Sequence, residues 1–221
     1  AMMHQVKHVV VIGGGVLGLE AAWELKKAGS QVTVLELAPQ LMGRQLDDDA
    51  GEMLKRISES VGIQIHTGVS IQSIEGDEHV TGVKLEDGTV FPGELVIISC
   101  GVSANVGLAK EAGIQVDRSV IVDENMMTSI SDIYAAGDCA QYKGLNYGIW
   151  PQALEEGKVA GACAAGDPDI KYEPETPALS FHGMNTALFA IGDNGKNPDL
   201  IYKTLELKDR GKKQYQRYYF L

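Results

Sequence analysis

The chain opens with an apolar run, a cluster of glycines, and then apolar residues at helical spacing. Residues 7–12 form a continuous valine-rich run, which is typical of a strand buried on both faces. The next apolar positions recur every three or four residues as far as Gly29, which predicts a helix that ends there. Residues 31–36 form a second β-branched run. The opening therefore predicts one β-α-β unit.

The pattern then changes from helical spacing to short alternation. An amphipathic helix is expected over residues 47–61, followed by a strand over 63–66. Between Val69 and Pro92, apolar and polar residues alternate, and the pairs Gly76-Asp77 and Asp87-Gly88 mark hairpin turns. This segment predicts an antiparallel β-meander in the place of a crossover helix.

A second set of elements follows the meander. Residues 95–100 predict a fully buried strand, and residues 106–112 predict a short helix. The segment DIYAAGDCA, residues 132–140, predicts a strand that runs into a Gly-Asp turn. A helix is expected from Pro151 to about Ala165, since proline is well suited to the first helical position.

The last quarter of the chain has a different character. Residues 167–177 are polar and rich in proline, which predicts a linker or domain edge. Residues 186–193 and 200–221 predict antiparallel strands, with a turn at Asp209-Arg210-Gly211. Because the chain stops directly after the apolar residues YYF, we expect that it is truncated.

Composition excludes several classes of function. The chain has 221 residues, is 44% hydrophobic, and has neither a long apolar run nor a secretory signal, which predicts a cytoplasmic protein without a membrane partner. A net charge of −11 argues against nucleic acid as a partner. The three cysteines, Cys100, Cys139 and Cys163, have no metal-ligand or C-x-x-C spacing, so no metal site is predicted.

The glycines that follow the first strand form the pattern G-x-G-x-x-G. Gly13 allows a tight turn, Gly15 lets the backbone approach a pyrophosphate, and Gly18 lets the helix pack closely on the strand. The free N–H groups of the helix N-terminus then face the anion. We expect the whole loop to bind a dinucleotide, through Gly13, Gly14, Gly15, Val16, Leu17 and Gly18. The alternative is a glycine turn that serves packing alone.

Glu36 ends the second strand, 23 residues after Gly13. An acid at this position accepts hydrogen bonds from the adenine ribose hydroxyls, whereas a 2′-phosphate loses such a bond, at a cost of about 1.5–3 kcal/mol. The next basic residue, Arg44, lies eight positions further on. The sequence therefore favours NADH over NADPH. The alternative is that Glu36 is only a solvated acid at a strand end.

Several motifs in order resemble the pyridine-nucleotide-disulfide oxidoreductase superfamily of FAD-dependent NAD(P)H enzymes. They are GGGVLGLEAAWEL, VTVLE, LEDG, LVIISCGVSAN and VDENMMTSISDIYAAGDCA, followed by the helix from Pro151. The match covers nearly all of residues 7–166 and is most similar to rubredoxin reductases, the flavoprotein part of nitrite reductases and the ferredoxin reductases of dioxygenases. The resemblance implies an α/β fold with three parts: a Rossmann-like NAD-binding domain at 1–116, the C-terminal half of an FAD domain at 117–170, and the start of an α+β C-terminal interface domain, cut short, at 171–221.

The resemblance also implies roles for single residues. Asp138 is expected to bind the ribityl chain of FAD, and Gly137 to allow close approach. Trp150 either lies beside the isoalloxazine or packs in the core. Glu20 is expected in the first turn of the helix, near the nicotinamide, although an acid there is also a good partner for the helix dipole. Arg44 is expected to reach the NAD phosphates or adenine ribose, and Gly101 to pass close to the nicotinamide.

The function that the resemblance implies is an oxidoreductase that passes a hydride from NADH to flavin and electrons to an acceptor. That acceptor is a redox protein, a disulfide, a nitrite-reductase centre or oxygen. No protein acid or base is required for the hydride step, so no catalytic residue is predicted. Because the chain has one G-x-G-x-x-G, we expect the N-terminal FAD half to be missing and the fragment to be inactive alone, with FAD bound poorly. A homodimer is compatible with the family. The alternative function is a stand-alone NAD-sensing regulatory module.

Overall fold

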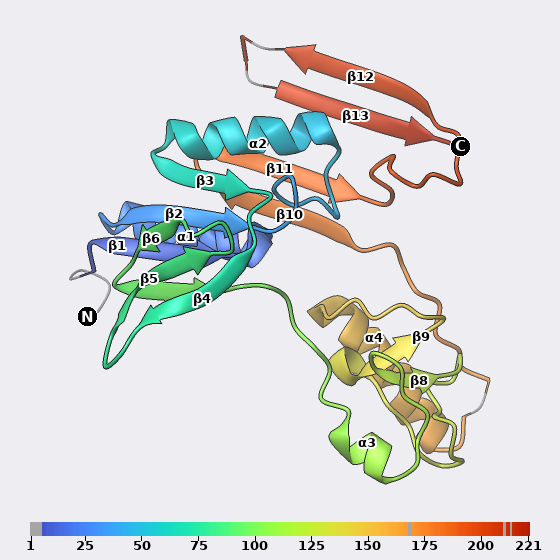
Figure 1. Cartoon of the computed structure of the whole chain (residues 1–221). Coiled ribbons are helices and arrows are strands. Elements are labelled where there is room, and N and C mark those ends of the chain that lie inside the picture. Colours follow the sequence, from blue (N-terminus) through green and yellow to red (C-terminus); the bar gives the residue numbers. More distant parts are fainter. Residues whose placement is uncertain (1–5, 168, 210, 213) are drawn as a thin grey trace. The chain divides into compact units, whose positions relative to one another are not determined.

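The protein consists of two compact units. The computed structural model describes residues 6–167, 169–209, 211–212 and 214–221 (Figure 1). The first unit combines the chain up to Cys100 with Ala178–Leu221, and the second unit is Gly101–Pro177. The three-part domain division proposed from the sequence stays a prediction.

A parallel sheet forms the centre of the first unit. Its strands run in the order β3-β2-β1-β7, with β1 (His8–Ile12) between β2 (Gln31–Glu36) and β7 (Leu95–Ile98), and β3 (Ile63–Thr67) at the outer edge. All pairings are parallel, and β1 and β2 are in register from His8 opposite Gln31 onward. The predicted β-α-β opening is therefore confirmed.

Successive residues of the sheet pack on opposite sides. Val9, Val11, Val32 and Val34 lie in the same core as Leu19, Ala22 and Leu25 of α1 (Val16–Lys27). The residues between them, Val10, Ile12 and Leu35, pack against Val83 and Leu85 of the meander instead. This alternation, expected for a strand buried on both faces, explains why the valine run lacks polar positions.

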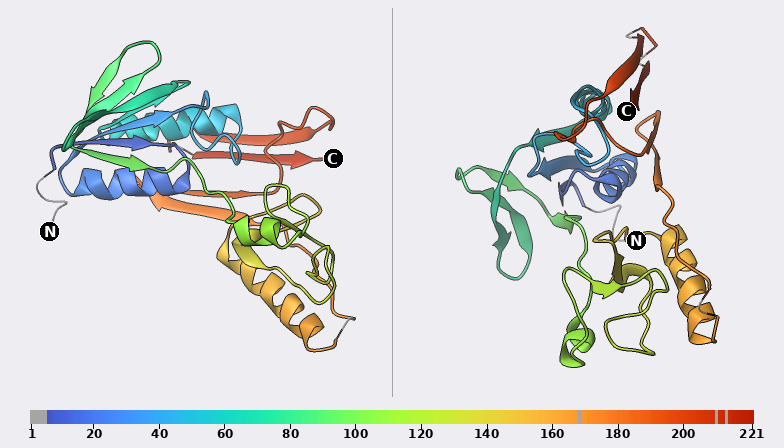
Figure 2. Two further views of the ribbon diagram at one scale, coloured as in Figure 1. Left: turned by 60° about the horizontal axis from the view of Figure 1, so that its bottom comes forward. Right: turned by 90° about the vertical axis from the view of Figure 1, so that its right-hand side faces the viewer.

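The predicted meander is confirmed. It comprises β4 (Ile71–Gly76), β5 (Val80–Leu85) and β6 (Val90–Pro92), paired antiparallel in that order. Figure 2 shows these green strands on the side of the parallel sheet away from α1. The predicted helix is also confirmed as α2 (Asp48–Ser60), and the carboxylate of its N-cap, Asp47, accepts a bond from the amide of Ala50 at 2.8 Å.

One strand is less buried than the sequence predicts. Residues 95–100 were expected as a fully buried strand, but β7 ends at Ile98, whose side chain is 66% exposed. The reason is position, because β7 pairs only with β1 in the described part of the chain and so lies at the edge of the sheet. Hydrophobic composition alone does not distinguish an edge strand from a central one.

The C-terminal segment returns to the first unit as two hairpins. Strands β10 (Ala178–Gly183) and β11 (Thr186–Ile191) pair with each other, as do β12 (Lys203–Asp209) and β13 (Gln214–Phe220). Phe181 of β10 is fully buried in the core that α1 shares with the sheet. The expected strands are confirmed, β10 is an additional one, and Arg210 of the predicted turn lies outside the described residues.

The second unit is built around a short parallel pair and one long helix. Strand β8 (Val120–Val122) pairs with β9 (Ala140–Tyr142), and α4 (Trp150–Ala164) packs on them through Val159 and Cys163. A short helix, α3 (Gly107–Glu111), precedes them as predicted.

The segment 132–140 contains the predicted Gly-Asp turn, but the residues before the turn do not form the predicted strand. Only an isolated bridge joins Tyr134 to Met127, and Gly137–Cys139 form a 3₁₀ turn, η2. Gly137 has φ = +78°, a left-handed conformation that ends any extended run.

Helix α1 begins unusually close to the end of β1. A Cβ atom added at Gly18 lies 2.1 Å from the carbonyl oxygen of Gly13, and one added at Gly13 lies 2.2 Å from the carbonyl oxygen of Ser99. Gly13 also has φ = +110°. Only glycine satisfies both positions, whereas a Cβ at Gly15 meets nothing within 4 Å.

These contacts predict different costs for two alanine substitutions. We expect Gly18→Ala to lower the free energy of unfolding of the first unit by about 1–3 kcal/mol or more, because the methyl group forces the helix off the strand. Gly15→Ala should cost less than about 1 kcal/mol, since it changes only an N-cap residue. Urea unfolding followed by Trp23 fluorescence in a Trp150→Phe background measures both, and equal losses would contradict the close approach.

Candidate functional site

The glycine loop places the start of α1 at the carboxyl edge of the sheet. It follows the central strand β1, and the amide of Gly13 donates to the carbonyl of Leu35 at 2.8 Å. Gly15 is the N-cap of α1, and no side-chain bond caps this helix. The first-turn N–H groups, beginning with Val16 and the exposed Leu17, are thus left for a ligand. The open space at Gly15 is the space that a pyrophosphate needs, so the loop fits a dinucleotide.

Glu36 lies directly beside this loop. Its Oε2 accepts a bond from the amide of Gly14 at 2.5 Å, and its Oε1 accepts one from the amide of Ala38 at 2.7 Å. The two bonds fix the half-buried carboxylate at the end of β2. Each oxygen keeps a lone pair for a ribose hydroxyl. Glu36 is therefore more than a solvated strand-end acid.

The segment after Glu36 folds back over the glycine loop. The amide of Met42 donates to the carbonyl of Gly14 at 3.1 Å, and the side chain of Leu41 lies against Gly14. A cavity of about 460 Å³ lies where this segment meets α2 and the end of β3; its lining includes Pro39, Leu41, Lys55 and Thr67. The structure thus brings the glycine loop, Glu36 and this cavity to one edge of the sheet.

Two further predicted residues lie in this unit, with fewer contacts. The side chain of Arg44 is exposed on the folded-back segment and has no bonding partner among the described residues. Glu20 is exposed as well, but it is the fifth residue of α1. The expectation that Glu20 lies in the first turn is wrong, because the helix begins at Val16. The nicotinamide role of Glu20 stays a prediction.

The predicted flavin residues lie in the second unit. Gly137 donates its amide to Oε2 of Glu156 at 2.7 Å, and Asp138 is exposed in the same 3₁₀ turn. Glu156 comes from α4 and is 5% exposed, and sequence reasoning did not identify it. Its local pattern is only that of one acid in the pair Glu155-Glu156, so no signal in the sequence marked it. Gly137 and Asp138 keep their flavin roles as predictions.

Trp150 and Gly101 also lie in the second unit. Trp150 is the first residue of α4 and is 77% exposed, so it does not pack in the core of its unit. Pro151, expected at the first helical position, is the second residue instead. Gly101 is exposed with φ = +97° and begins the unit. Their expected contacts with cofactor rings remain predictions.

Burial raises the pKa of Glu156, and the bond from Gly137 offsets only part of that rise. A carboxyl group whose native pKa lies above its unfolded value binds a proton more readily in the folded state, so stability falls as the pH rises through that interval. As the pH rises above about 4.5, we expect Glu156 to reduce the free energy of unfolding of the wild-type chain, so Glu156→Gln should lose less over the same interval, since glutamine cannot titrate but still accepts from Gly137.

The matched control is Glu155→Gln. Glu155 is exposed and pairs with Lys158 on the surface of the same helix, so its variant should follow the wild-type profile. Urea unfolding at several pH values measures all three proteins. Parallel profiles for wild type and Glu156→Gln would show that the buried carboxyl group does not control the pH dependence.

Within the described residues, no group of three or more His, Cys, Asp or Glu side chains is placed to hold a metal ion. In the same part of the chain, no helix has the length and apolar character needed to cross a membrane.

Comparison with known proteins gives consistent matches. The family model "Pyridine nucleotide-disulphide oxidoreductase" matches residues 2–157. The chain is 38% identical to the nitrite reductase [NAD(P)H] of Bacillus subtilis (strain 168), over 87% of this chain and 24% of that protein. It is 29% identical to the crystal structure of the ferredoxin reductase for the CYP199A2 system from Rhodopseudomonas palustris, with a TM-score of 0.87 over 99% of this chain and 54% of that chain.

A third match is the reductase in the crystal structure of the covalent putidaredoxin reductase-putidaredoxin complex. It has 28% identity and a TM-score of 0.83 over 96% of this chain and 52% of that chain. The chain thus spans about a quarter of the nitrite reductase and about half of the two solved structures. The predicted α/β fold is confirmed, as are NAD and FAD as the cofactors at the level of the family. Because the family model covers most of its length, the chain belongs to the pyridine nucleotide-disulphide oxidoreductase family.

Proposed function

We propose that this chain is the NADH-binding part of an FAD-dependent oxidoreductase that passes electrons on to an acceptor. The observation that carries the proposal is the uncapped N-terminus of α1, which opens beside a carboxylate held by the amides of Gly14 and Ala38. That combination suits a pyrophosphate next to a ribose with two free hydroxyls. The family assignment supports the reaction class.

The candidate site residues of the first unit then have the following binding roles. The first-turn amides of α1 donate to the pyrophosphate, and Gly15 lets it approach. The oxygens of Glu36 accept from the two ribose hydroxyls while keeping their backbone bonds. Arg44 contributes positive charge on the adenosine side, and we assign Glu20 to the nicotinamide end. Gly101, which begins the second unit, keeps its nicotinamide role as a prediction. A ligand with a 2′-phosphate meets the like charge of Glu36.

The second unit contributes to the flavin site. We assign the Gly137-Asp138 turn to the ribityl chain, with Glu156 holding the turn through the amide of Gly137. The N-terminus of α4 would stabilise negative charge on the pyrimidine side of a bound flavin, and the exposed Trp150 would contact its rings. When bound, NADH supplies a hydride and FAD accepts it, so the chain needs to orient the two groups and exclude water rather than move a proton.

The names of the relatives support several classes of acceptor. One relative is named a nitrite reductase, another is named an NADH oxidase, and two solved structures are reductases of a ferredoxin and of putidaredoxin. We propose a redox protein, a disulfide, a nitrite-reductase centre or oxygen as the acceptor, in a cytoplasmic enzyme, with a homodimer as the expected assembly. The domain division at 1–116, 117–170 and 171–221 belongs to the same proposal.

Nucleotide preference tests the binding site directly. We expect the 221-residue chain to bind NADH at least about 10-fold more tightly than NADPH, because a 2′-phosphate loses a charge-assisted bond at Glu36. Glu36→Gln should reduce this preference by removing the charge. Isothermal titration of both nucleotides measures it, and Glu24→Gln, an exposed acid elsewhere on α1, serves as the control. Equal affinity for the two nucleotides would argue against the assignment of Glu36.

Enzyme activity separates the oxidoreductase from a regulatory NAD sensor. We expect the product of the complete reading frame containing this chain, supplied with FAD, to reduce ferricyanide with NADH. The 221-residue chain should bind NADH with little or no turnover. Steady-state absorbance at the NADH band measures both. If both proteins bind NADH and neither reduces the dye, the sensor explains the chain better.

A further inference from the structure

The C-terminal segment of the first unit contacts the loop that follows Glu36, far away in the sequence. The side-chain amide nitrogen of Asn194 lies 3.3 Å from the carbonyl oxygens of both Gly43 and Arg44, and 3.4 Å from that of Leu46. An amide group has two donor hydrogens, which these three acceptors share. The Oδ1 atom of Asn194 accepts from the backbone amide of Lys196 at 3.2 Å, which orients the group.

Lys196 holds the beginning of the same loop. Its Nζ atom lies 2.8 Å from Oε1 of Gln40 and 2.8 Å from a carboxylate oxygen of Asp48. Gln40 in turn donates to the carbonyl oxygen of Leu46 at 3.0 Å. Gln40 therefore joins the beginning of the loop both to its end, at Leu46, and to the C-terminal segment, at Lys196.

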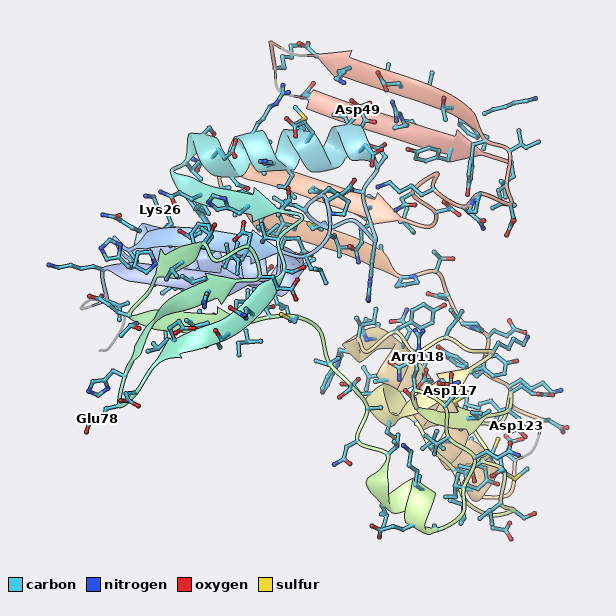
Figure 3. The ribbon with its side chains drawn as sticks, viewed as in Figure 1. Lys26, Asp49, Glu78, Asp117, Arg118 and Asp123 are labelled. Atoms are coloured by element: carbon cyan, nitrogen blue, oxygen red, sulfur yellow. The ribbon has the colours of Figure 1, made fainter. Side chains whose placement is uncertain are left out.

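The end of the loop is held by the second hairpin. The hydroxyl groups of Tyr215 and Tyr219 on β13 donate to Oδ2 of Asp47 at 2.8 and 2.7 Å, and the guanidinium of Arg217 lies 3.5 Å from the same oxygen. Arg217 also bonds Asp49 at 3.0 Å, and Figure 3 shows Asp49 on α2 facing β13. Asp47 is 8% exposed, and burial, with the Asp47 carboxylate adding to it, raises the pKa of Tyr219 to about 12.

The opposite side of the loop rests on the dinucleotide fingerprint. Met42 donates to Gly14, and Leu41 lies against that glycine, as described above. Residues 40–47 are thus held between the C-terminal segment and the glycine loop. Arg44 projects from the middle of this stretch and has no described partner to fix its side chain. Its position depends on the backbone that Asn194 holds.

We propose that Asn194 is a positioning residue for NADH binding, which acts by holding the backbone of residues 43–46 so that Arg44 stays in place on the segment that contacts Gly14. The inference rests on the proposed NADH site. According to this proposal, the affinity for NADH depends on Asn194, which lies in the C-terminal segment and 150 residues from Arg44 in the sequence.

The test compares NADH affinity in the 221-residue chain. Asn194→Ala is expected to weaken NADH binding by about 3- to 10-fold, which corresponds to the usual net worth of one or two hydrogen bonds. Asn194→Asp keeps the size of the side chain but replaces the donor by an acceptor, so it should weaken binding at least as much. The control is Asn197→Ala, since the side chain of Asn197 accepts only a local bond from Asp199 among the described residues.

A double-mutant cycle with Arg44→Ala separates positioning from a general loss of stability. If Asn194 acts through Arg44, Asn194→Ala should have little further effect on NADH affinity once Arg44 is alanine. Fully additive effects, or unchanged affinity in both Asn194 variants, would overturn the inference. Tm values checked in parallel show whether each variant is folded.

Hydrogen exchange keeps the inference testable apart from the proposed function. Asn194→Ala should speed amide exchange over residues 41–47, while Asn197→Ala should leave it unchanged. If the wild-type chain binds no NADH, the proposed function fails. In that case, faster exchange over residues 41–47 in Asn194→Ala still supports the conclusion that Asn194 holds the loop. Unchanged exchange in this variant overturns that conclusion.

Discussion

The nucleotide-binding edge depends on one close approach, between the helix residue Gly18 and the carbonyl oxygen of Gly13. A single Cβ atom at Gly18 would stand 2.1 Å from that oxygen. Because glycine has no Cβ atom, α1 begins directly over the end of the central strand, and its uncapped backbone amides lie at the carboxyl edge of the sheet. The same turn brings the amide of Gly14 within 2.5 Å of Glu36, so helix, loop and acid are fixed as one arrangement.

Features that depend on local pattern could be predicted from the sequence. Residues 31–36 form β2 with the bounds expected, and the alternation after Val69 gives a meander, because side-chain periodicity and glycine turns act over a few residues. The burial of β7 was predicted wrongly, since it depends on which strands lie beside it. The Gly-Asp turn in segment 132–140 was predicted correctly, but the strand expected before it is only a bridge between Tyr134 and Met127, since a strand depends on the partner that the fold supplies.

The candidate site divides in the same way. Glycine spacing and the acid at the end of the second strand identify the loop and Glu36, which lie together in the structure. The contact of Glu156 with Gly137 spans 19 residues, and that of Asn194 with Arg44 spans 150. No periodic pattern connects residues so far apart, and an isolated Asn or Glu is common on any surface. Such residues are found only when the folded chain brings them together.

The first unit is made of two segments that are far apart in the sequence, and this separation affects how the unit folds. Phe181 completes the core shared by α1 and the sheet, yet the whole of residues 101–177 is made before it. Residues 101–177 form the loop that joins the two parts of the first unit. Until β10 docks at the end of this loop, the face of α1 that meets β10 stays exposed to solvent. Loop-closure entropy then opposes a contact that stabilises the core, which is typical of slow folding with non-local contacts. During synthesis, the first unit therefore spends time with an uncovered apolar face, a state that favours association with other chains.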